Sequence, residues 1–367
     1  MNEKMMKILG GIIAGFVIFI VILFLISSCS GGNYTYEKLE ERMLKVAKDY
    51  YEHNEKELPS QDKDQKVYTL KKMISDGKID KLEELFDNED IKCDGNVTVS
   101  NNNGYYIYSP YLTCGKDYRT KYLYEKVIED ALVEAGVGLY ESGDEYIMKG
   151  EVKNNYIKYG EKLYRIMRIN NDNSIRVIED EGIPSITWDD RYNENTKYAN
   201  GINEYVLNNQ VSSRLKESLD NYYNNPEYAK VWTDELKGYI QTQTLCIGKR
   251  SESDTTKDGS TECSVKLENQ LLGSLAIYEY LQASLDSSCS NTIDKNCRNY
   301  NWLGTMSKTI WTITGDAENS DRSYSIYRRP NSSGCKTKYY ANAVFNLTDK
   351  TIYVSGKGTE EDPYIFK

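Results

Sequence analysis

The chain has 367 residues and a mass of 42.3 kDa, which excludes a single small module and suggests about two domains. Its 46 Lys and Arg residues against 56 Asp and Glu residues give a net charge of -10, which argues against binding to nucleic acid through the phosphates. Hydrophobic residues make up 39% of the chain, enough for a folded core. The chain has one histidine, His53, so a multi-histidine metal site is excluded and a catalytic triad has a single candidate base.

The amino terminus predicts a membrane-spanning helix. Lys4 and Lys7 precede an uncharged apolar run over residues 8–26. At a rise of about 1.5 Å per residue, this run spans about 28 Å, close to the hydrocarbon thickness of a bilayer. The flanking lysines predict a cytoplasmic amino terminus, with everything after residue 30 outside the cell. The first predicted partner is therefore the lipid bilayer, contacted through residues 8–26.

The end of the apolar run leaves two forms of the anchor open. Ile26-Ser27-Ser28-Cys29 resembles the lipobox of bacterial lipoproteins, in which the cysteine is acylated and the preceding segment is removed. Alternatively, the helix is not cleaved and Cys29 is incidental. We favour the uncleaved helix, because the apolar region of a cleavable signal usually has about 7 to 15 residues. In both forms, residues 1–30 act as a membrane anchor.

Residues 31–138 are predicted to form a small α+β domain that begins with helices. Its first helix is expected over residues 36–58, because Leu39, Met43, Val46 and Tyr50 form one apolar stripe at helical spacing. A second short helix is expected over residues 69–79 and ends near Gly77.

A β-hairpin with a disulfide is predicted after these helices. Residues 96–100 and 105–108 are rich in β-branched and aromatic side chains, and Asn101–Gly104 between them is typical of a turn. Cys93 and Cys114 are equidistant from the middle of this turn, so we expect them to face each other and form a disulfide.

The order of membrane helix, amphipathic helix and disulfide-closed hairpin resembles the layout of type IV pilins and pseudopilins. The segment Gly15-Phe16-Val17-Ile18-Phe19-Ile20 lacks the threonine and the glutamate of the pilin processing site. The resemblance therefore implies a pilin-like stalk without implying processing or filament assembly. An unrelated α+β spacer is the alternative.

Residues 139–367 are predicted to form a second, mostly antiparallel β domain with two helices. The glycine-rich stretch 136–143 marks the boundary, and all four tryptophans follow it. Strand-like runs are expected at 156–159, 163–169 and 174–178, and further short strands at 324–327, 343–345 and 352–354. The two helices are expected along the stripe Val211, Leu215, Leu219 and Tyr222, ending before Pro226, and over 274–283.

Several short motifs occur in this second domain. They are Tyr146-Ile147-Met148-Lys149-Gly150, Asn154-Asn155-Tyr156-Ile157, Leu163-Tyr164-Arg165-Ile166, Trp188-Asp189, Tyr278-Glu279-Tyr280-Leu281-Gln282-Ala283-Ser284, Asn299-Tyr300-Asn301-Trp302-Leu303, Gly356-Lys357-Gly358-Thr359 and Asp362-Pro363-Tyr364. With these motifs, residues 145–367 resemble a family of uncharacterised surface domains from Gram-positive gut bacteria. That family is distantly similar to the C-type-lectin-like fold of formylglycine-generating enzymes and bacterial adhesins, which implies two helices packed on a twisted antiparallel sheet. The calcium-lectin motifs Glu-Pro-Asn and Trp-Asn-Asp are absent, so calcium-dependent sugar binding is not implied.

The remaining cysteines predict an oxidising compartment. Cys246 and Cys263 enclose a polar loop, and Cys289 and Cys297 enclose a shorter one. Disulfides across such loops contribute about 2 to 3 kcal/mol each. Cys335 is left over, either as a free buried thiol, as a partner of Cys29, or re-paired within the domain. No C-x-x-C pair or histidine lies near these cysteines, so no metal site is predicted.

Two further features bear on activity and on recognition. The carboxylates Glu179, Asp180, Glu181, Asp189 and Asp190 cluster in the sequence, where they could ligate calcium or form an acid and base pair. Such runs are more often solvated loops, so no catalytic residue and no cofactor are predicted. The 33 tyrosines against 6 phenylalanines suit a recognition surface, although a compositional bias explains the excess better.

The sequence therefore predicts a non-catalytic binding or adhesion protein, anchored in the membrane of a Gram-positive-type bacterium and exposed outside the cell. Its ligand would be an extracellular glycan or protein, and not a nucleic acid. A pseudopilin-like component of a secretion or uptake machine is the first alternative, and an extracellular enzyme the second.

Overall fold

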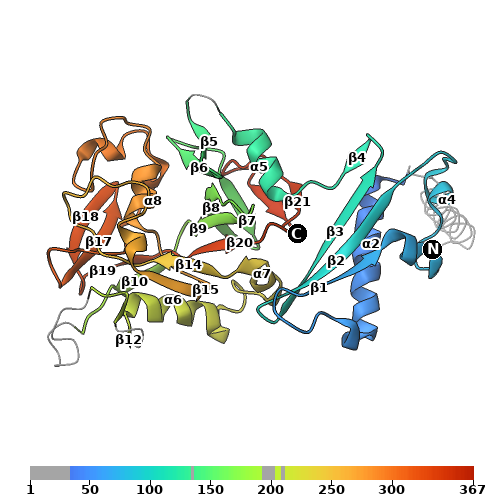
Figure 1. The fold of residues 1–367 in the computed structure, drawn as a ribbon, viewed down its shortest axis with the longest axis horizontal. Helices are drawn as coiled ribbons and strands as arrows, with labels where there is room; N and C mark the ends of the chain where they lie inside the picture. Colours follow the sequence, from blue (N-terminus) through green and yellow to red (C-terminus); the bar gives the residue numbers. More distant parts are fainter. Residues whose placement is uncertain (1–33, 134–135, 192–202, 208–210) are drawn as a thin grey trace, which may run out of the picture. The chain divides into compact units, whose positions relative to one another are not determined.

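The computed structural model describes residues 34–133, 136–191, 203–207 and 211–367 (Figure 1). The predicted anchor at residues 8–26 and Cys29 lie outside the described residues. Within the described part of the chain, no helix is both long enough and apolar enough to cross a membrane. The membrane anchor and the acylation of Cys29 therefore stay predictions.

The chain divides into two compact units, each made of several segments. Unit 1 contains residues 34–53, Tyr68–Val97 and Pro110–Arg119. Unit 2 contains Asn54–Val67, Thr98–Ser109 and Thr120–Lys367.

Unit 1 is built on helix α2, Tyr36–His53 (Figure 1). The helix buries Leu39, Met43 and Val46 of the predicted apolar stripe, whereas Tyr50 is only partly buried and its neighbour Tyr51 is buried instead. The helix ends before the predicted Leu58, and the chain continues into a 3-10 turn, η1, at Glu55–Glu57. Close packing against α2 requires glycine at position 95. A Cβ atom there would lie 2.9 Å from the Met43 side chain and 2.8 Å from the carbonyl oxygen of Tyr111. The backbone of β2 at Gly95 therefore lies directly against the Met43 side chain of α2, where no other residue would fit.

The second predicted helix is confirmed as α3, Leu70–Ser75, and it is shorter than expected. The Thr69 hydroxyl accepts a hydrogen bond from the backbone N–H of Lys72 and so caps the helix. Gly77, with a φ of 65°, follows the helix end, as its sequence position predicted. A further helix, α4 at Leu82–Phe86, was not predicted.

The predicted hairpin is confirmed. Strands β1 (Gln65–Thr69), β2 (Asp94–Asn102), β3 (Tyr105–Cys114) and β4 (Tyr118–Arg119) form a sheet in the order β1-β2-β3-β4. The turn is tighter than expected, because Asn101 and Asn102 belong to β2. Asn103 and Gly104 both have positive φ, 55° and 84°, as a two-residue hairpin turn requires.

Unit 2 is organised around a nine-stranded sheet. Its central path runs β13-β20-β9-β8-β7-β22-β21, and the hairpin β5-β6 joins it through β8. The strands are β5 (Gly138–Ser142), β6 (Glu145–Lys149), β7 (Tyr156–Tyr159), β8 (Lys162–Ile169), β9 (Ile175–Glu179), β13 (Ile240–Gln241), β20 (Val344–Leu347), β21 (Tyr353–Ser355) and β22 (Tyr364–Phe366). The predicted meander is confirmed as β7, β8 and β9. Within the glycine-rich stretch that was predicted to mark the domain boundary, Gly138–Ser142 forms strand β5.

A five-stranded sheet completes the main framework of unit 2 (Figure 1). Its order is β10-β19-β16-β17-β18, with strands at Ile183–Thr187, Lys338–Ala341, Ile310–Gly315, Arg322–Tyr327 and Arg329–Gly334. Two small antiparallel pairs accompany it, β11 (Val206–Leu207) with β12 (Val211–Ser212), and β14 (Gln243–Cys246) with β15 (Lys266–Gln270). The described chain is therefore α+β with mostly antiparallel sheets, and the predicted fold class is confirmed at that level.

Short helices connect these strands. They are α5 (Leu123–Ala131), α6 (Arg214–Asn224), α7 (Asp234–Tyr239) and α8 (Ile277–Gln282), with 3-10 turns η3 (Pro226–Tyr228), η4 (Glu262–Ser264), η5 (Lys295–Arg298) and η6 (Trp302–Thr305). Helix α6 ends before Pro226, as predicted, but Val211 belongs to β12, because the helix begins only after its cap, Ser213. Helix α8 lies inside the predicted segment 274–283, and α7 was not predicted.

The aromatic side chains fill the core of unit 2. Trp188, Trp232, Trp302 and Trp311 are all buried. The Trp188 indole N–H donates to the carbonyl of Thr312 at 2.8 Å, and the Trp311 indole N–H donates to that of Ile186 at 2.8 Å. Tyr164, Tyr205, Tyr280, Tyr324 and Tyr364 are buried as well. A large part of the tyrosine excess therefore serves packing.

Candidate functional site

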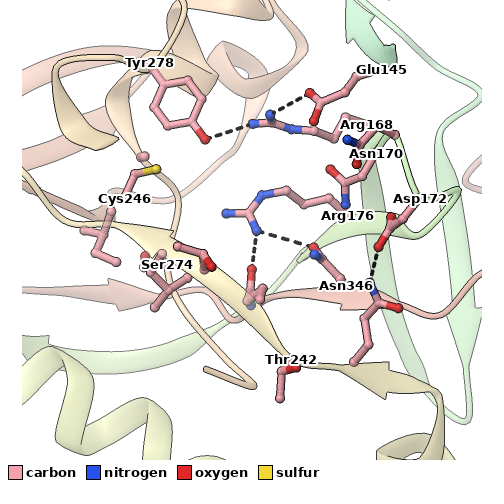
Figure 2. A pocket seen from close by; sticks show the side chains of 17 residues that line it. Glu145, Arg168, Asn170, Asp172, Arg176, Thr242, Cys246, Ser274, Tyr278 and Asn346 are labelled. Atoms are coloured by element: carbon pink, nitrogen blue, oxygen red, sulfur yellow. Dashed lines mark hydrogen bonds and ion pairs between the residues drawn. The ribbon is translucent and has the colours of Figure 1, made fainter. Parts of the chain in front are cut away.

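A polar pocket of about 390 Å³ opens in unit 2 at the nine-stranded sheet, beside the segment that leads into α8 (Figure 2). We call it the arginine pocket. Its lining residues are Glu145, Arg168, Asn170, Asn171, Asp172, Arg176, Gln241, Thr242, Gln243, Thr244, Leu245, Cys246, Ser274, Ala276, Tyr278, Ile313 and Asn346.

Strand register places the arginines of this pocket. Arg168 on β8 lies directly opposite Arg176 on β9. Arg176 lies opposite Asn346 on β20, and Asn346 lies opposite Gln241 on β13. The four polar residues thus form one row across four neighbouring strands. Two like charges directly opposite each other destabilise a sheet, so the arginine pair needs a counter-charge.

Glu279 on α8 supplies that counter-charge. Its Oε1 accepts from Arg168 Nη2 at 2.5 Å and from Arg176 Nε at 2.6 Å. Its Oε2 accepts from Arg176 Nη2 at 3.3 Å and from the backbone N–H of Ala276 at 2.9 Å. Burial alone would raise the pKa of Glu279, but Arg176 and Arg168 outweigh burial and lower it. Glu279 is therefore ionised and holds both arginines in place.

Further contacts orient the arginine side chains (Figure 2). Arg168 donates through Nη1 to Glu145 Oε2 and through Nη2 to the Tyr278 hydroxyl, both at 3.3 Å. Arg176 Nη1 donates to the side-chain oxygens of Gln243 and Asn346. The two guanidinium groups are matched by the carboxylates of Glu279 and Glu145. The cluster therefore has no excess positive charge that would favour a strongly anionic ligand.

The turn between β8 and β9 and the start of β14 form the walls. Asp172 accepts from Gln241 Nε2 at 2.8 Å and from the Ser174 hydroxyl at 2.5 Å. Burial would raise the pKa of Asp172, but these hydrogen bonds and that of the Ser174 backbone lower it. Asn171, Thr242 and Thr244 add amide and hydroxyl groups. The walls thus offer both donors and acceptors, as the hydroxyl groups of a ligand require.

Most of the residues that line the pocket have hydrogen-bonding side chains. Its cysteine, Cys246, is bonded to Cys263, so the sulfur does not act as a nucleophile. The histidine of the chain, His53, lies on α2 in unit 1. Within the described segments, no group of three His, Cys, Asp or Glu side chains is placed to hold a metal ion.

The expected disulfides are present. The structure pairs Cys93 with Cys114, Cys246 with Cys263, and Cys289 with Cys297. In the described chain, Cys335 is a free buried thiol. Burial raises its pKa to about 12, which makes it unreactive at neutral pH.

Four of the five acidic residues that cluster in the sequence are paired with basic side chains, and among the described residues they form no metal-binding group. Glu179 is buried and bonds to the Tyr222 hydroxyl at 2.8 Å and to Lys162 at 3.2 Å. Asp189 pairs with Arg191 at 2.6 Å, and Asp190 pairs with Arg214 at 3.2 Å. Glu181 shares Lys162 with Glu179, at 3.6 Å, and none of the five carboxylates lines the arginine pocket.

Arg168 and Arg176 were not predicted as site residues, and Glu279 appeared only within a sequence motif. A signal was available, since both arginines interrupt runs of apolar residues predicted to be strands. Charged residues at positions that the pattern assigns to the core often mark a site. No protein-family model, no curated protein and no solved structure matches this chain.

Proposed function

We propose that this protein is an extracytoplasmic binding or adhesion protein that binds a hydroxyl-rich ligand, of the glycan class, in the arginine pocket. The observation that carries the proposal is the row of Arg168, Arg176, Asn346 and Gln241, held by Glu279 in a pocket of about 390 Å³. This volume lies within the range of about 300 to 1,000 Å³ that is usual for small-molecule sites.

The charge balance favours a neutral, polar ligand over an anion. Arg168 makes three hydrogen bonds within the cluster and Arg176 makes four, so each guanidinium group keeps only part of its five N–H donors for a ligand. The pocket adds amides, hydroxyls and the Asp172 carboxylate. These groups are already held by one another, so little ordering is needed when a ligand binds. A sugar ring, with hydroxyl groups that both donate and accept, matches such a lining.

Two further features support a place outside the cell, and a third supports a binding role. The three disulfides fit an oxidising compartment. Lys4 and Lys7 before the apolar run at 8–26 support an anchored chain that faces outward. The resemblance of residues 145–367 to C-type-lectin-like surface domains supports a binding role for unit 2.

A glycan array probed with the full chain in detergent tests the ligand class. We expect binding to a defined set of glycans, and loss of that binding in Asn171→Trp, which places an indole at the exposed edge of the pocket. Asn224→Trp, at an exposed position on α6, is the matched control and should bind like the wild type. Equal binding by the wild type and Asn171→Trp would contradict the assignment of the site.

Protease treatment of intact protoplasts tests the location. We expect the protease to remove the part of the chain after residue 30, since the lysine-flanked run predicts that this part lies outside. A cytosolic protein should remain intact in the same sample. Full protection of the chain would contradict the extracytoplasmic proposal.

A second candidate is a pseudopilin-like component of a surface machine. The amphipathic helix α2 and the disulfide-closed hairpin β2-β3 favour it, because these are the elements expected of a pilin-like stalk. Co-purification of the full chain with other surface-assembly proteins would support this function.

A further inference from the structure

A second pocket, of about 510 Å³, lies in unit 2 and shares no lining residue with the arginine pocket. We call it the Arg165 pocket. It is lined by Glu151, Val152, Lys153, Tyr156, Arg165, Thr305, Thr359, Glu360 and Glu361.

Arg165, on β8, is buried and is held by three hydrogen bonds and two aromatic rings. Its Nε donates to Asn155 Oδ1 at 2.7 Å, its Nη1 to the Tyr156 hydroxyl at 3.1 Å, and its Nη2 to the carbonyl of Val152 at 3.0 Å. The guanidinium carbon lies 4.0 Å from the centre of the Tyr156 ring and 4.8 Å from that of Trp302. The cation is therefore fixed between two aromatic faces.

Arg165 differs from the other buried arginines in its lack of a carboxylate partner. Arg168, Arg176 and Arg250 each have a carboxylate oxygen at 2.5 to 2.9 Å. Arg165 forms no ion pair with any carboxylate of the described residues. Three of its five N–H groups are used by neutral acceptors, which leaves two for a ligand. A buried charge without a counter-charge is unfavourable, so an anionic group that binds beside it is stabilised.

The mouth of the Arg165 pocket is acidic. Glu151, Glu360 and Glu361 are exposed there, against one lysine, Lys153. The Tyr156 hydroxyl, which accepts from Arg165, donates to Glu360 Oε2 at 3.5 Å. The Tyr156 hydroxyl therefore links the buried guanidinium group of Arg165 to the Glu360 carboxylate at the mouth.

We propose that the Arg165 pocket binds a small zwitterion of the α-amino acid class. The ligand carboxylate pairs with Arg165, and the ligand ammonium group faces Glu360 and Glu361. A simple anion is disfavoured by the carboxylates at the mouth, and a simple amine by the guanidinium group at the floor. Val152 and the Tyr156 ring offer an apolar wall to the rest of the ligand. This proposal does not depend on glycan binding in the arginine pocket.

Ligand-observed NMR with the full chain in detergent tests the ligand class. The probes are the standard amino acids, each at millimolar concentration, followed by the amine and the carboxylic acid that correspond to the best binder. We expect the zwitterion to bind at least about tenfold more tightly than either analogue, because each analogue loses one charge-assisted contact. Binding by no amino acid would overturn the proposal, as would equal binding by one of the analogues.

The mutational test uses exposed residues at the mouth of the Arg165 pocket, because replacing the buried Arg165 could unfold the domain. The double variant Glu360→Gln and Glu361→Gln should weaken binding of the best amino acid about tenfold. Glu227→Gln, at an exposed carboxylate that does not line this pocket, should bind like the wild type. Thr305→Trp should block the pocket, and Asn171→Trp, in the arginine pocket, should not. Unchanged binding in the double variant or in Thr305→Trp would overturn the proposal.

Discussion

Arg250 and Glu262 form a fully buried ion pair inside the loop that the Cys246–Cys263 disulfide closes. Arg250 Nη1 lies 2.9 Å from Glu262 Oε2 and 3.1 Å from Oε1, and both side chains are completely shielded from solvent. Glu262 Oε1 also accepts from the backbone N–H of Tyr278, on α8. The pair therefore connects the disulfide loop to the helix that holds the arginine pocket.

Breaking this pair on one side should be strongly destabilising. Arg250→Met is expected to lower the free energy of unfolding by about 3 to 5 kcal/mol, because it leaves the Glu262 carboxylate buried without its partner. Urea unfolding followed by tryptophan fluorescence measures the change. The double variant Arg250→Met and Glu262→Met should be more stable than either single variant, since it leaves no buried charge. A double variant less stable than both would contradict this explanation.

The Cys93–Cys114 disulfide should stabilise the end of hairpin β2-β3 that belongs to unit 1. It closes a segment with a sequence separation of 21, for which loop-closure entropy predicts about 3 kcal/mol. Cys93→Ser should lower the stability of unit 1 by about this amount and leave ligand binding in unit 2 unchanged. Non-reducing peptide mapping provides the direct check. A peptide that joins Cys93 to a cysteine other than Cys114 would contradict the hairpin register.

Acid should remove the contribution that ionised Glu279 makes to the stability of the folded protein. Its pKa is lowered below 4.5 in the folded protein, so its stabilising effect is fully present above pH 4.5 and is lost as the pH falls through the lowered pKa. The stability difference between the wild type and Glu279→Gln should therefore be about 3 kcal/mol or more at neutral pH and shrink below pH 4.5. Urea unfolding at a series of pH values measures it. A difference that does not change with pH would show that Glu279 is not the titrating group.

The thiol of Cys335 should be hidden in the native protein. Its pKa is raised to about 12 and its side chain is buried, so a thiol reagent should modify it slowly at neutral pH. The Cys29→Ser variant removes the other unassigned cysteine from the measurement. We expect one thiol to react after denaturation and almost none before it. Fast reaction of the native variant would show that Cys335 is accessible.

Local chemistry made several elements predictable from the sequence. The hairpin follows from the Asn103-Gly104 pair, whose positive φ angles few other residues adopt easily, and from cysteines placed symmetrically around it. Helix α3 is bounded by local signals as well: the Thr69 hydroxyl caps its start by a hydrogen bond, and Gly77, with a positive φ, follows its end. Strands β7, β8 and β9 are separated by short turns, so neighbours in sequence became neighbours in the sheet. All of these signals lie within a few residues of the structure that they specify.

Long-range packing decided what the sequence pattern could not. Strand β5 forms within a glycine-rich stretch because Gly138 lies against the chain of α5, where a Cβ atom would be 2.5 Å from the carbonyl oxygen of Ala131. The arginine pocket depends on partners still farther away. Arg176 and Glu279 are 103 positions apart, and Arg176 and Asn346 are 170 apart. Two arginines within apolar strands are stable only when a carboxylate lies close to both of them. Here that carboxylate is Glu279 of α8, and its position depends on the strand register and on where the helix packs.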